Sequence, residues 1–337
     1  MPPKDALEVL VRSVTYQTET ARSYELVDAD LQRLPEFTAG SHIDVFFRDG
    51  RIRQYSLAND PAEKHRYVIG VLREDKGRGG SRLFHDRVVP GYHIFISAPR
   101  NNFHLSSSAS RHILVGGGIG ITPLLSMAWE LKRTGSDFVL HYCTRSPQET
   151  AFQLEMAPLV RDGKAIIHHD GGNPAKGLDI AELLADRDEG DHVYYCGPPG
   201  FMAAVRESTS HWPAGTVHFE YFSAAIPSRG AGVSEDKSES ESESHESPEV
   251  GGEFLIRIAS SGKEFWVPQD RSIAEVLREN GVNVETSCES GLCATCRIPY
   301  LEGEVEHQDL VLDEEERKSE LTACCSRSRS KVLVLGL

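Results

Sequence analysis

The chain has 337 residues, a hydrophobic content of 39% and a formal net charge of −15. This length allows two or three domains with separate cores, and the composition is ordinary for a globular protein. The acidic balance argues against nucleic acid, and the sequence has no apolar run of membrane-spanning or signal-peptide length, so we expect a cytoplasmic protein with reduced cysteines.

Residues 1–105 contain short apolar runs rich in β-formers, near residues 7–16, 42–47, 67–72 and 92–97. Glycine, proline, aspartate and asparagine lie between these runs, as in "FRDGR" and "VVPGY". Several short strands separated by turn signals are typical of a β-barrel or β-sandwich. We therefore predict an all-β domain over residues 1–105.

Two stretches of this domain could bind a phosphate and an aromatic ring. The strand "RIRQYSLAND" presents Arg53, Tyr55, Ser56 and Leu57. The segment "KGRGGSRLFHD" places Gly79, Gly80 and Ser81 at the start of a predicted helix. Free N–H groups and the helix dipole at such a start favour an anion. Taken singly, an edge strand with a common aromatic explains the first stretch better than a binding site does.

Residues 106–227 alternate between strand and helix patterns, which predicts a parallel sheet with covering helices. The stretch "HILVGGGIGITPLLSM" joins the first strand to the first helix and contains Gly116, Gly117, Gly118, Gly120 and Thr122. It differs from the dehydrogenase fingerprint G-x-G-x-x-G. A glycine-rich turn still lets a pyrophosphate approach backbone N–H groups, although a tight turn needed only for packing is the alternative.

Two more stretches fall where strands of this domain end. "YYCGPPGFM" places Cys196, Gly197 and Pro198 after one strand, and a small buried cysteine is the alternative interpretation. "YCTRSPQETAF" places Arg145 and Ser146 after the second strand, where an adenosine ribose is expected. These two residues could meet a 2′-phosphate. An acidic residue at that strand end would favour NAD, and the stretch has none there. The residues alone do not decide whether the cofactor is NADH or NADPH.

Residues 228–251 alternate serine and glutamate with almost no apolar residue. Such a segment cannot bury enough surface to offset its chain entropy, so we predict a flexible acidic linker. Residues 252–337 then form a separate domain, with a hairpin near 253–268, a short helix near 272–281 and a final strand near 331–335.

The stretch "TSCESGLCATCRIP" of this last domain clusters Cys288, Cys293 and Cys296. Cys324 and Cys325 follow 28 and 29 positions after Cys296, and either could be a fourth ligand. Spacings of four and two residues with a distant fourth cysteine are typical of a plant-type 2Fe–2S cluster. Zinc is the main alternative, although its sites usually pair ligands in two short C-x₂₋₄-C units.

These motifs follow one another in an order that resembles the phthalate dioxygenase reductase branch of the ferredoxin–NADP reductase superfamily. The resemblance covers nearly the whole chain and rests on R-x-Y-S-L, G-x-G-G-S, G-G-I-G-I-T-P, C-G-P and C-x-S-R. It implies a multidomain fold: an antiparallel β-barrel flavin domain, an α/β parallel-sheet nicotinamide domain and an α+β, β-grasp ferredoxin domain. The long Ser/Glu linker departs from the family, whose members join these domains more tightly.

The resemblance also implies roles for individual residues. Arg53, Gly80 and Ser81 would hold the flavin phosphate, while Tyr55 and Ser56 would contact the ring. Cys196 would lie at the nicotinamide, and Phe222 of "VHFEYFSA" would reach the flavin, with Tyr221 as the alternative. The C-x-S-R pattern, matched to Ser326 and Arg327, selects Cys324 as the fourth cluster ligand.

The implied function is the reductase component of an oxygenase system. A reduced nicotinamide, NADH by resemblance, would give a hydride to FMN, and electrons would pass singly to the 2Fe–2S cluster. The resemblance implies FMN rather than FAD, and the sequence agrees in that the barrel has no extra segment suited to an adenosine half. The partner would be a terminal Rieske-type aromatic oxygenase or demethylase. We expect this chain to be a monomer, and hydride transfer requires no catalytic acid or base from it. The alternatives are a haem monooxygenase or separate ferredoxin as acceptor, and a redox-sensing iron–sulfur protein.

Overall fold

The computed structural model describes residues 3, 6–30, 32–48, 50–75, 79–222, 252–269, 271–286, 291, 294–309 and 311–337. The predicted linker, Cys288 and Cys293 lie outside these residues. The chain forms two compact units, Met1–Phe222 and Ser223–Leu337, and each is described separately. Among the described residues, no helix combines the length and the apolarity that crossing a bilayer requires.

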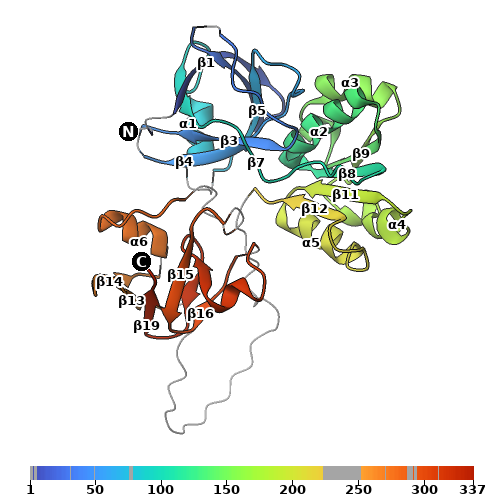
Figure 1. Ribbon diagram of the computed structural model, residues 1–337. Helices are drawn as coiled ribbons and strands as arrows, with labels where there is room; N and C mark the ends of the chain where they lie inside the picture. The colour runs from blue at the N-terminus through green and yellow to red at the C-terminus, as the bar shows by residue number, and fades with distance from the viewer. Residues whose placement is uncertain are drawn as a thin grey trace, which may run out of the picture. The chain divides into compact units, whose positions relative to one another are not determined.

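The first unit begins with a seven-stranded antiparallel sheet in the order β4-β3-β6-β1-β2-β5, with β7 paired to β3 (Figure 1). Its strands are β1 (Leu7–Tyr16), β2 (Ala21–Asp28), β3 (Ser41–Phe46), β4 (Ile52–Ser56), β5 (Tyr67–Leu72), β6 (His93–Ile96) and β7 (Arg100–Asn101). A bridge from Leu57 to Ile69 joins the two ends of the strand order and closes the barrel. Helix α1 (Gly80–Arg87) adds Phe84 to the core, where its ring meets Tyr24 edge-on.

Strand β2 is missing from the sequence-based expectations. It pairs with β1 on one side and β5 on the other, and most of its residues are buried. Burial on both faces removes the alternation of apolar and polar residues that marks a half-exposed strand.

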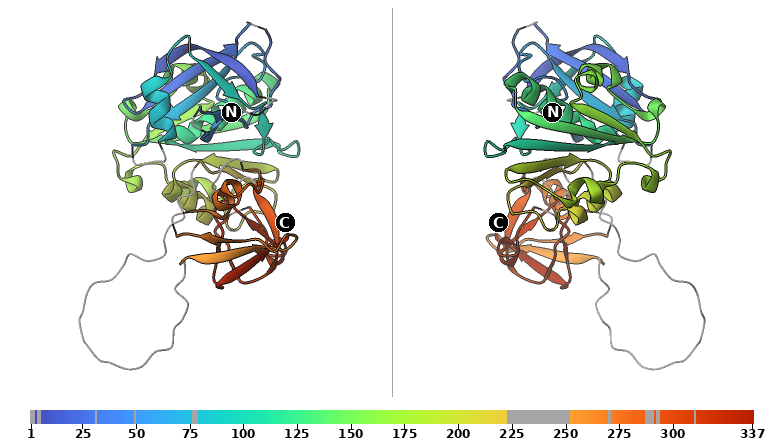
Figure 2. Two further views of the ribbon diagram at one scale, coloured as in Figure 1. Left: turned by 90° about the vertical axis from the view of Figure 1, so that its left-hand side faces the viewer. Right: turned by 90° about the vertical axis from the view of Figure 1, so that its right-hand side faces the viewer.

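A five-stranded parallel sheet follows in the order β10-β9-β8-β11-β12. Its strands are β8 (Arg111–Gly117), β9 (Asp137–Thr144), β10 (Ala165–His169), β11 (Asp191–Cys196) and β12 (Val217–Glu220). Its helices are α2 (Ile121–Thr134), α3 (Gln153–Arg161), α4 (Ile180–Ala185) and α5 (Pro199–Ser208). Helices α2 and α3 cover one face and α4 and α5 the other (Figures 1 and 2). The strand order reverses between β8 and β11, where such sheets bind ligands.

The barrel and the parallel sheet are packed tightly against each other within this unit. Phe152 has a positive φ of 59° and donates its N–H to Oε1 of Gln17 in the barrel, at 2.7 Å. A side chain at Gly70 of β5 would place its Cβ 2.7 Å from Thr122 and 3.0 Å from Phe152. The two domains therefore meet where the barrel has no side chain.

The second unit contains a mixed sheet in the order β14-β13-β19-β15-β17 and a separate pair, β16-β18. Its strands are β13 (Phe254–Ile258), β14 (Glu264–Val267), β15 (Arg297–Glu302), β16 (Val305–Glu306), β17 (Glu320–Thr322), β18 (Arg327–Ser328) and β19 (Val332–Leu335). Helix α6 (Ile273–Glu279) starts with a capping box formed by Ser272 and Glu275. Strand β15 also escapes the sequence patterns, because Pro299 within it argues against a strand in the middle of a sheet.

We expect Gly70→Ala to destabilise the first unit by about 1–3 kcal/mol, because the added methyl group overfills the contact with Thr122 and Phe152. The urea midpoint of tryptophan fluorescence measures this loss. Gly200→Ala is the matched control, since a Cβ there meets no atom within 4 Å and the position lies in helix α5. Equal midpoints for the two variants would contradict the packing argument.

Candidate functional site

The glycine turn and the C-G-P stretch meet at the carboxyl ends of β8 and β11. Gly116 is in register with Cys196 across the two strands. A Cβ at Gly120 would lie 2.3 Å from the carbonyl oxygen of Cys196, and one at Gly197 would lie 3.1 Å from Cα of Gly117. The two backbones therefore approach so closely that neither position can carry a side chain.

Two helices begin beside this contact. Helix α2 starts one residue after Gly120, and α5 starts one residue after Pro198, neither with a side-chain cap. The dipoles of the two helices give the crevice a positive potential suited to a pyrophosphate, although the proline at the first position of α5 has no N–H to donate. Gly118, with φ of 54°, has no atom within 4 Å of its Cβ position. Thr122 is buried, and its hydroxyl donates to the carbonyl of Ile119.

Cys196 is fully buried in this crevice. Burial, reinforced by the nearby carboxyl of Glu220, raises the pKa of its thiol well above the ordinary value. Cys196 is therefore a neutral thiol at physiological pH.

Glu220, at the end of β12, joins the barrel to the sheet. It is in register with Cys196, and its Oε2 accepts a hydrogen bond of 2.9 Å from the hydroxyl of Ser56 in β4. Nδ1 of His42 lies 3.8 Å from its Oε1. Burial raises the pKa of Glu220 to about 7, although the Ser56 hydrogen bond acts in the opposite direction. Ser56 and Cys196, predicted from separate motifs, thus meet around one carboxyl group.

Neither Glu220 nor His42 was predicted from the sequence. The available signal for Glu220 was a single carboxylate within the apolar stretch "VHFEYF". Phe222, two residues further, is 40% exposed, whereas Tyr221 packs against Phe219. Phe222 is therefore the more accessible of the two aromatics considered for the flavin.

The predicted phosphate site lies at the start of α1. Gly79 precedes the helix in a left-handed conformation, and no side chain caps the helix. The guanidinium of Arg51 lies 2.7 Å from the Cβ position of Gly79, and Nε of Arg53 lies 2.8 Å from that of Gly80. Two cations beside uncapped N–H groups form a cradle that fits a phosphate. Arg51 escaped the sequence analysis because R-x-Y-S begins two residues later.

The other flavin-motif residues have different surroundings. The ring of Tyr55 meets Phe84 edge-on at 5.2 Å, and burial raises the pKa of its phenol. Leu57 is fully buried in the barrel core. The hydroxyl of Ser81 accepts a hydrogen bond from the N–H of Glu74. Their contacts with a flavin remain predictions.

The expected ribose site lies after β9. Arg145 is exposed, and its carbonyl accepts a hydrogen bond of 2.8 Å from Gly171. Ser146 precedes a short 3₁₀ turn at Pro147–Glu149. Asp170, at the end of β10, follows the neighbouring strand and so lies beside this position. Asp170 was not predicted from the sequence, because it follows β10 and not β9.

The described cysteines of the second unit are brought together by the pairing of β15 with β17. Arg297 is in register with Thr322, so Cys296 and the Cys324–Cys325 pair fall just beyond the paired ends. Cys296 is buried and Cys324 half-buried against the same core. The N–H of Gly291 donates to Sγ of Cys324 at 3.2 Å, while Sγ of Cys325 lies 3.1 Å from the hydroxyl of Thr322.

Arg327 of the C-x-S-R pattern holds the segment that follows the cysteine pair through hydrogen bonds to backbone carbonyls. Its guanidinium donates to the carbonyls of Pro268, Arg271 and Gly252 and stacks over the ring of Phe254. A nearly buried cation bound by three carbonyls fixes the segment that carries the cysteine pair.

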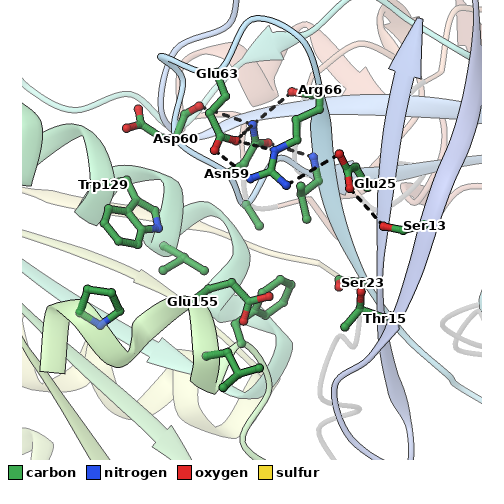
Figure 3. Close-up of a pocket in the computed structure, with 16 residues that line it drawn as sticks. Ser13, Thr15, Ser23, Glu25, Asn59, Asp60, Glu63, Arg66, Trp129 and Glu155 are labelled. Carbon is green, nitrogen blue, oxygen red and sulfur yellow. Dashed lines mark hydrogen bonds and ion pairs between the residues drawn. The ribbon is translucent and has the colours of Figure 1, made fainter. Parts of the chain in front are cut away.

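A separate cavity of about 410 Å³ lies between the barrel and helices α2 and α3 (Figure 3). On one wall Arg66 binds Glu63 at 2.8 Å and lies 3.8 Å from Glu25, while Trp129 and Glu155 line the opposite wall. None of the predicted flavin or nicotinamide residues is among the described residues that line it. We therefore assign it no part in the redox site.

Residues 114–207 match the family described as "Oxidoreductase NAD-binding domain", and residues 256–329 match "2Fe-2S iron-sulfur cluster binding domain". The chain is 51% identical to the tert-butanol monooxygenase / tert-amyl alcohol desaturase reductase subunit of Aquincola tertiaricarbonis, over 99% of this chain and 97% of the relative. The structure of phthalate dioxygenase reductase, described as a modular structure for electron transfer from pyridine nucleotides to 2Fe–2S, matches with a TM-score of 0.78 and 40% identity, over 98% of both chains.

A type IV self-sufficient cytochrome P450 monooxygenase also matches, with a TM-score of 0.73 and 33% identity, over 98% of this chain and 41% of that one. Similarity of this extent defines an oxidoreductase with a nicotinamide-binding domain and a 2Fe–2S domain. The chain belongs to the phthalate dioxygenase reductase-like family. The expected fold class, an antiparallel barrel, a parallel-sheet domain and a ferredoxin-type domain, is confirmed.

We expect the stability of the first unit to depend on the ionisation of Glu220. Its folded pKa, about 7, exceeds the value of an exposed glutamate, so the folded protein binds a proton that the unfolded chain releases. Stability should therefore fall as pH rises from about 4.5 to 7, by up to about 3 kcal/mol.

Glu220→Gln should remove this dependence, and urea unfolding at several pH values measures it. Glu207→Gln, which changes an exposed carboxylate of α5, is the control. Parallel stability curves for the wild type and the Glu220→Gln variant would contradict the assigned pKa.

Proposed function

We propose that this chain is the NADH-dependent reductase component of a Rieske-type oxygenase or demethylase system, with FMN and a 2Fe–2S cluster as its redox groups. One observation carries the proposal. Ser56 of the flavin motif and Cys196 of the nicotinamide motif meet at Glu220, through a hydrogen bond and a strand register. Two cofactor stretches more than 130 positions apart in the sequence thus share one site.

The flavin assignment is supported by the cradle at α1, where Arg51, Arg53 and the N–H groups after Gly79 fit one phosphate group. We assign Gly80 and Ser81 to this phosphate and Tyr55, Ser56 and Phe222 to the ring. A bound flavin would supply both two-electron chemistry with a nicotinamide and one-electron chemistry with a cluster. FMN needs only the single phosphate site, so we prefer it to FAD.

The nicotinamide would occupy the crevice between β8 and β11. Gly118, whose Cβ position meets no atom within 4 Å, leaves the backbone open to the pyrophosphate, while Gly116, Gly117 and Gly120 let the surrounding segments pack closely. The dipoles at the starts of α2 and α5 favour its negative charge. Cys196, Gly197 and Pro198 would form the wall at the nicotinamide ring. The carboxylate of Asp170 beside Arg145 disfavours a 2′-phosphate, which supports NADH over NADPH.

For the cluster we propose Cys288, Cys293, Cys296 and Cys324 as ligands. The N–H of Gly291 donates to Sγ of Cys324, as expected for a ligand thiolate whose charge is stabilised by backbone donors. Cys325 instead has the Thr322 hydroxyl beside its sulfur. Four thiolates at this spacing suit a 2Fe–2S cluster.

The partner would be a terminal oxygenase, because relatives of this chain are named as reductase subunits of such systems. We propose a cytoplasmic monomer whose acidic second unit meets a basic surface on that oxygenase. The second candidate is a haem enzyme as acceptor, favoured by the match to a self-sufficient cytochrome P450 monooxygenase. Reduction of each candidate partner by the purified protein distinguishes the two.

Anaerobic titration of the purified protein with NADH tests the redox assignment. We expect the flavin absorbance to bleach rapidly and the low-temperature EPR signal of a reduced 2Fe–2S cluster to appear, with NADPH acting more slowly. Release of the flavin should yield FMN. A colourless protein that contains zinc would overturn the proposal at the cysteine loop.

The two neighbouring cysteines provide a matched pair of variants for the fourth ligand. Cys324→Ser should lower the iron content and the cluster absorbance strongly, because a ligand thiolate is lost. Cys325→Ser should retain both, since its sulfur is assigned no iron. The reverse result would exchange the roles of Cys324 and Cys325.

A further inference from the structure

A buried carboxylate lies against the cysteine loop of the second unit. The side chain of Asp309 is fully buried, and its Oδ1 accepts a hydrogen bond of 2.9 Å from the N–H of Leu312. A Cβ built on Gly291 would lie 2.9 Å from Cα and 3.1 Å from Cβ of Asp309. Asp309 thus packs directly behind the glycine whose N–H reaches Sγ of Cys324.

This contact leaves the glycine little freedom. Gly291 has a φ of 71°, in the left-handed region that favours glycine, and its Cβ position is also 2.5 Å from Sγ of Cys325. Its backbone is therefore confined between Asp309 and the cysteine pair. Any movement of Asp309 would change the direction of the Gly291 N–H relative to the Cys324 sulfur.

Two basic side chains hold Asp309 in place. Nη2 of Arg317 donates to the carbonyl oxygen of Asp309 at 2.7 Å and lies 3.4 Å from Oδ1. Nδ1 of His307 lies 3.4 Å from Oδ2, and its Nε2 lies 3.0 Å from the carbonyl oxygen of Arg317. Among the described residues, Oδ2 accepts no hydrogen bond. A buried carboxylate whose guanidinium contact is as long as 3.4 Å retains a strong local field.

We propose that Asp309 is a positioning residue of the cluster site, which fixes the Gly291 N–H on the Cys324 sulfur and, together with Arg317, sets the reduction potential. The inference rests on the proposed 2Fe–2S cluster and its Cys324 ligand. Hydrogen bonds to the sulfurs and local charge both tune such potentials. Reduction adds an electron, so the negative charge of Asp309 opposes it and the positive charge of Arg317 favours it.

The test is an EPR-monitored redox titration of the full-length protein at one fixed pH. Asp309→Asn keeps the shape and the Oδ1 acceptor for Leu312 but removes the charge. We expect about a tenfold shift of the equilibrium toward the reduced cluster, which for a one-electron couple is about 59 mV. Glu314→Gln, which neutralises an exposed carboxylate five residues away, is the matched control and should leave the potential unchanged.

Arg317→Gln should shift the equilibrium in the opposite direction, toward the oxidised cluster. Arg317→Lys keeps the charge, so its reduction potential should remain closer to that of the wild type. If Asp309→Asn fails to assemble a cluster, the inference is tested by the reduction potentials of the two Arg317 variants, of which Arg317→Gln should have the lower. The inference is wrong if the wild type shows a cluster signal but the reduction potentials of Asp309→Asn and Arg317→Gln equal that of Glu314→Gln. Absence of any cluster signal in the wild type would instead overturn the proposed function.

Discussion

The hydrogen bond between Ser56 and Glu220 is the interaction on which the first unit depends. It joins the barrel strand β4 to the last strand of the parallel sheet, and it lies next to Cys196. A carboxyl group is costly to bury, and the raised pKa of Glu220 records that cost. The fold retains the group where the flavin motif and the nicotinamide motif meet. The contact that packs the barrel against the sheet thus also brings the two motifs together.

Close backbone contacts keep this junction rigid. The turn that contains Gly120 touches the carbonyl of Cys196, and Gly70 of the barrel touches Thr122 and Phe152. The strained backbone of Phe152, tied to Gln17, completes the interface. Hydride transfer between two bound rings requires such fixed geometry, because small displacements reduce the rate steeply.

The second unit builds its site differently, from backbone groups and a few buried charges. Pairing of β15 with β17 brings Cys296 to the Cys324–Cys325 pair, and Arg327 anchors the segment beyond them through three carbonyls. Gly291 then supplies an N–H to sulfur. Electron transfer needs no acid or base, so the polar residues near these cysteines can serve the proposed cluster by placing its ligands and tuning its potential.

The three kinds of domain and their order could be predicted from local motifs alone: R-x-Y-S-L, the glycine-rich turn, C-G-P and the cysteine spacing. Sequence patterns failed at β2, where burial on both faces hides the strand period, and at β15, where Pro299 argues against a strand. Only the tertiary structure brought Glu220 to Ser56, Arg51 to Gly79 and Asp309 to Gly291. These contacts join residues from separate elements, and strand order and packing, which local spacing does not encode, decide which of them meet.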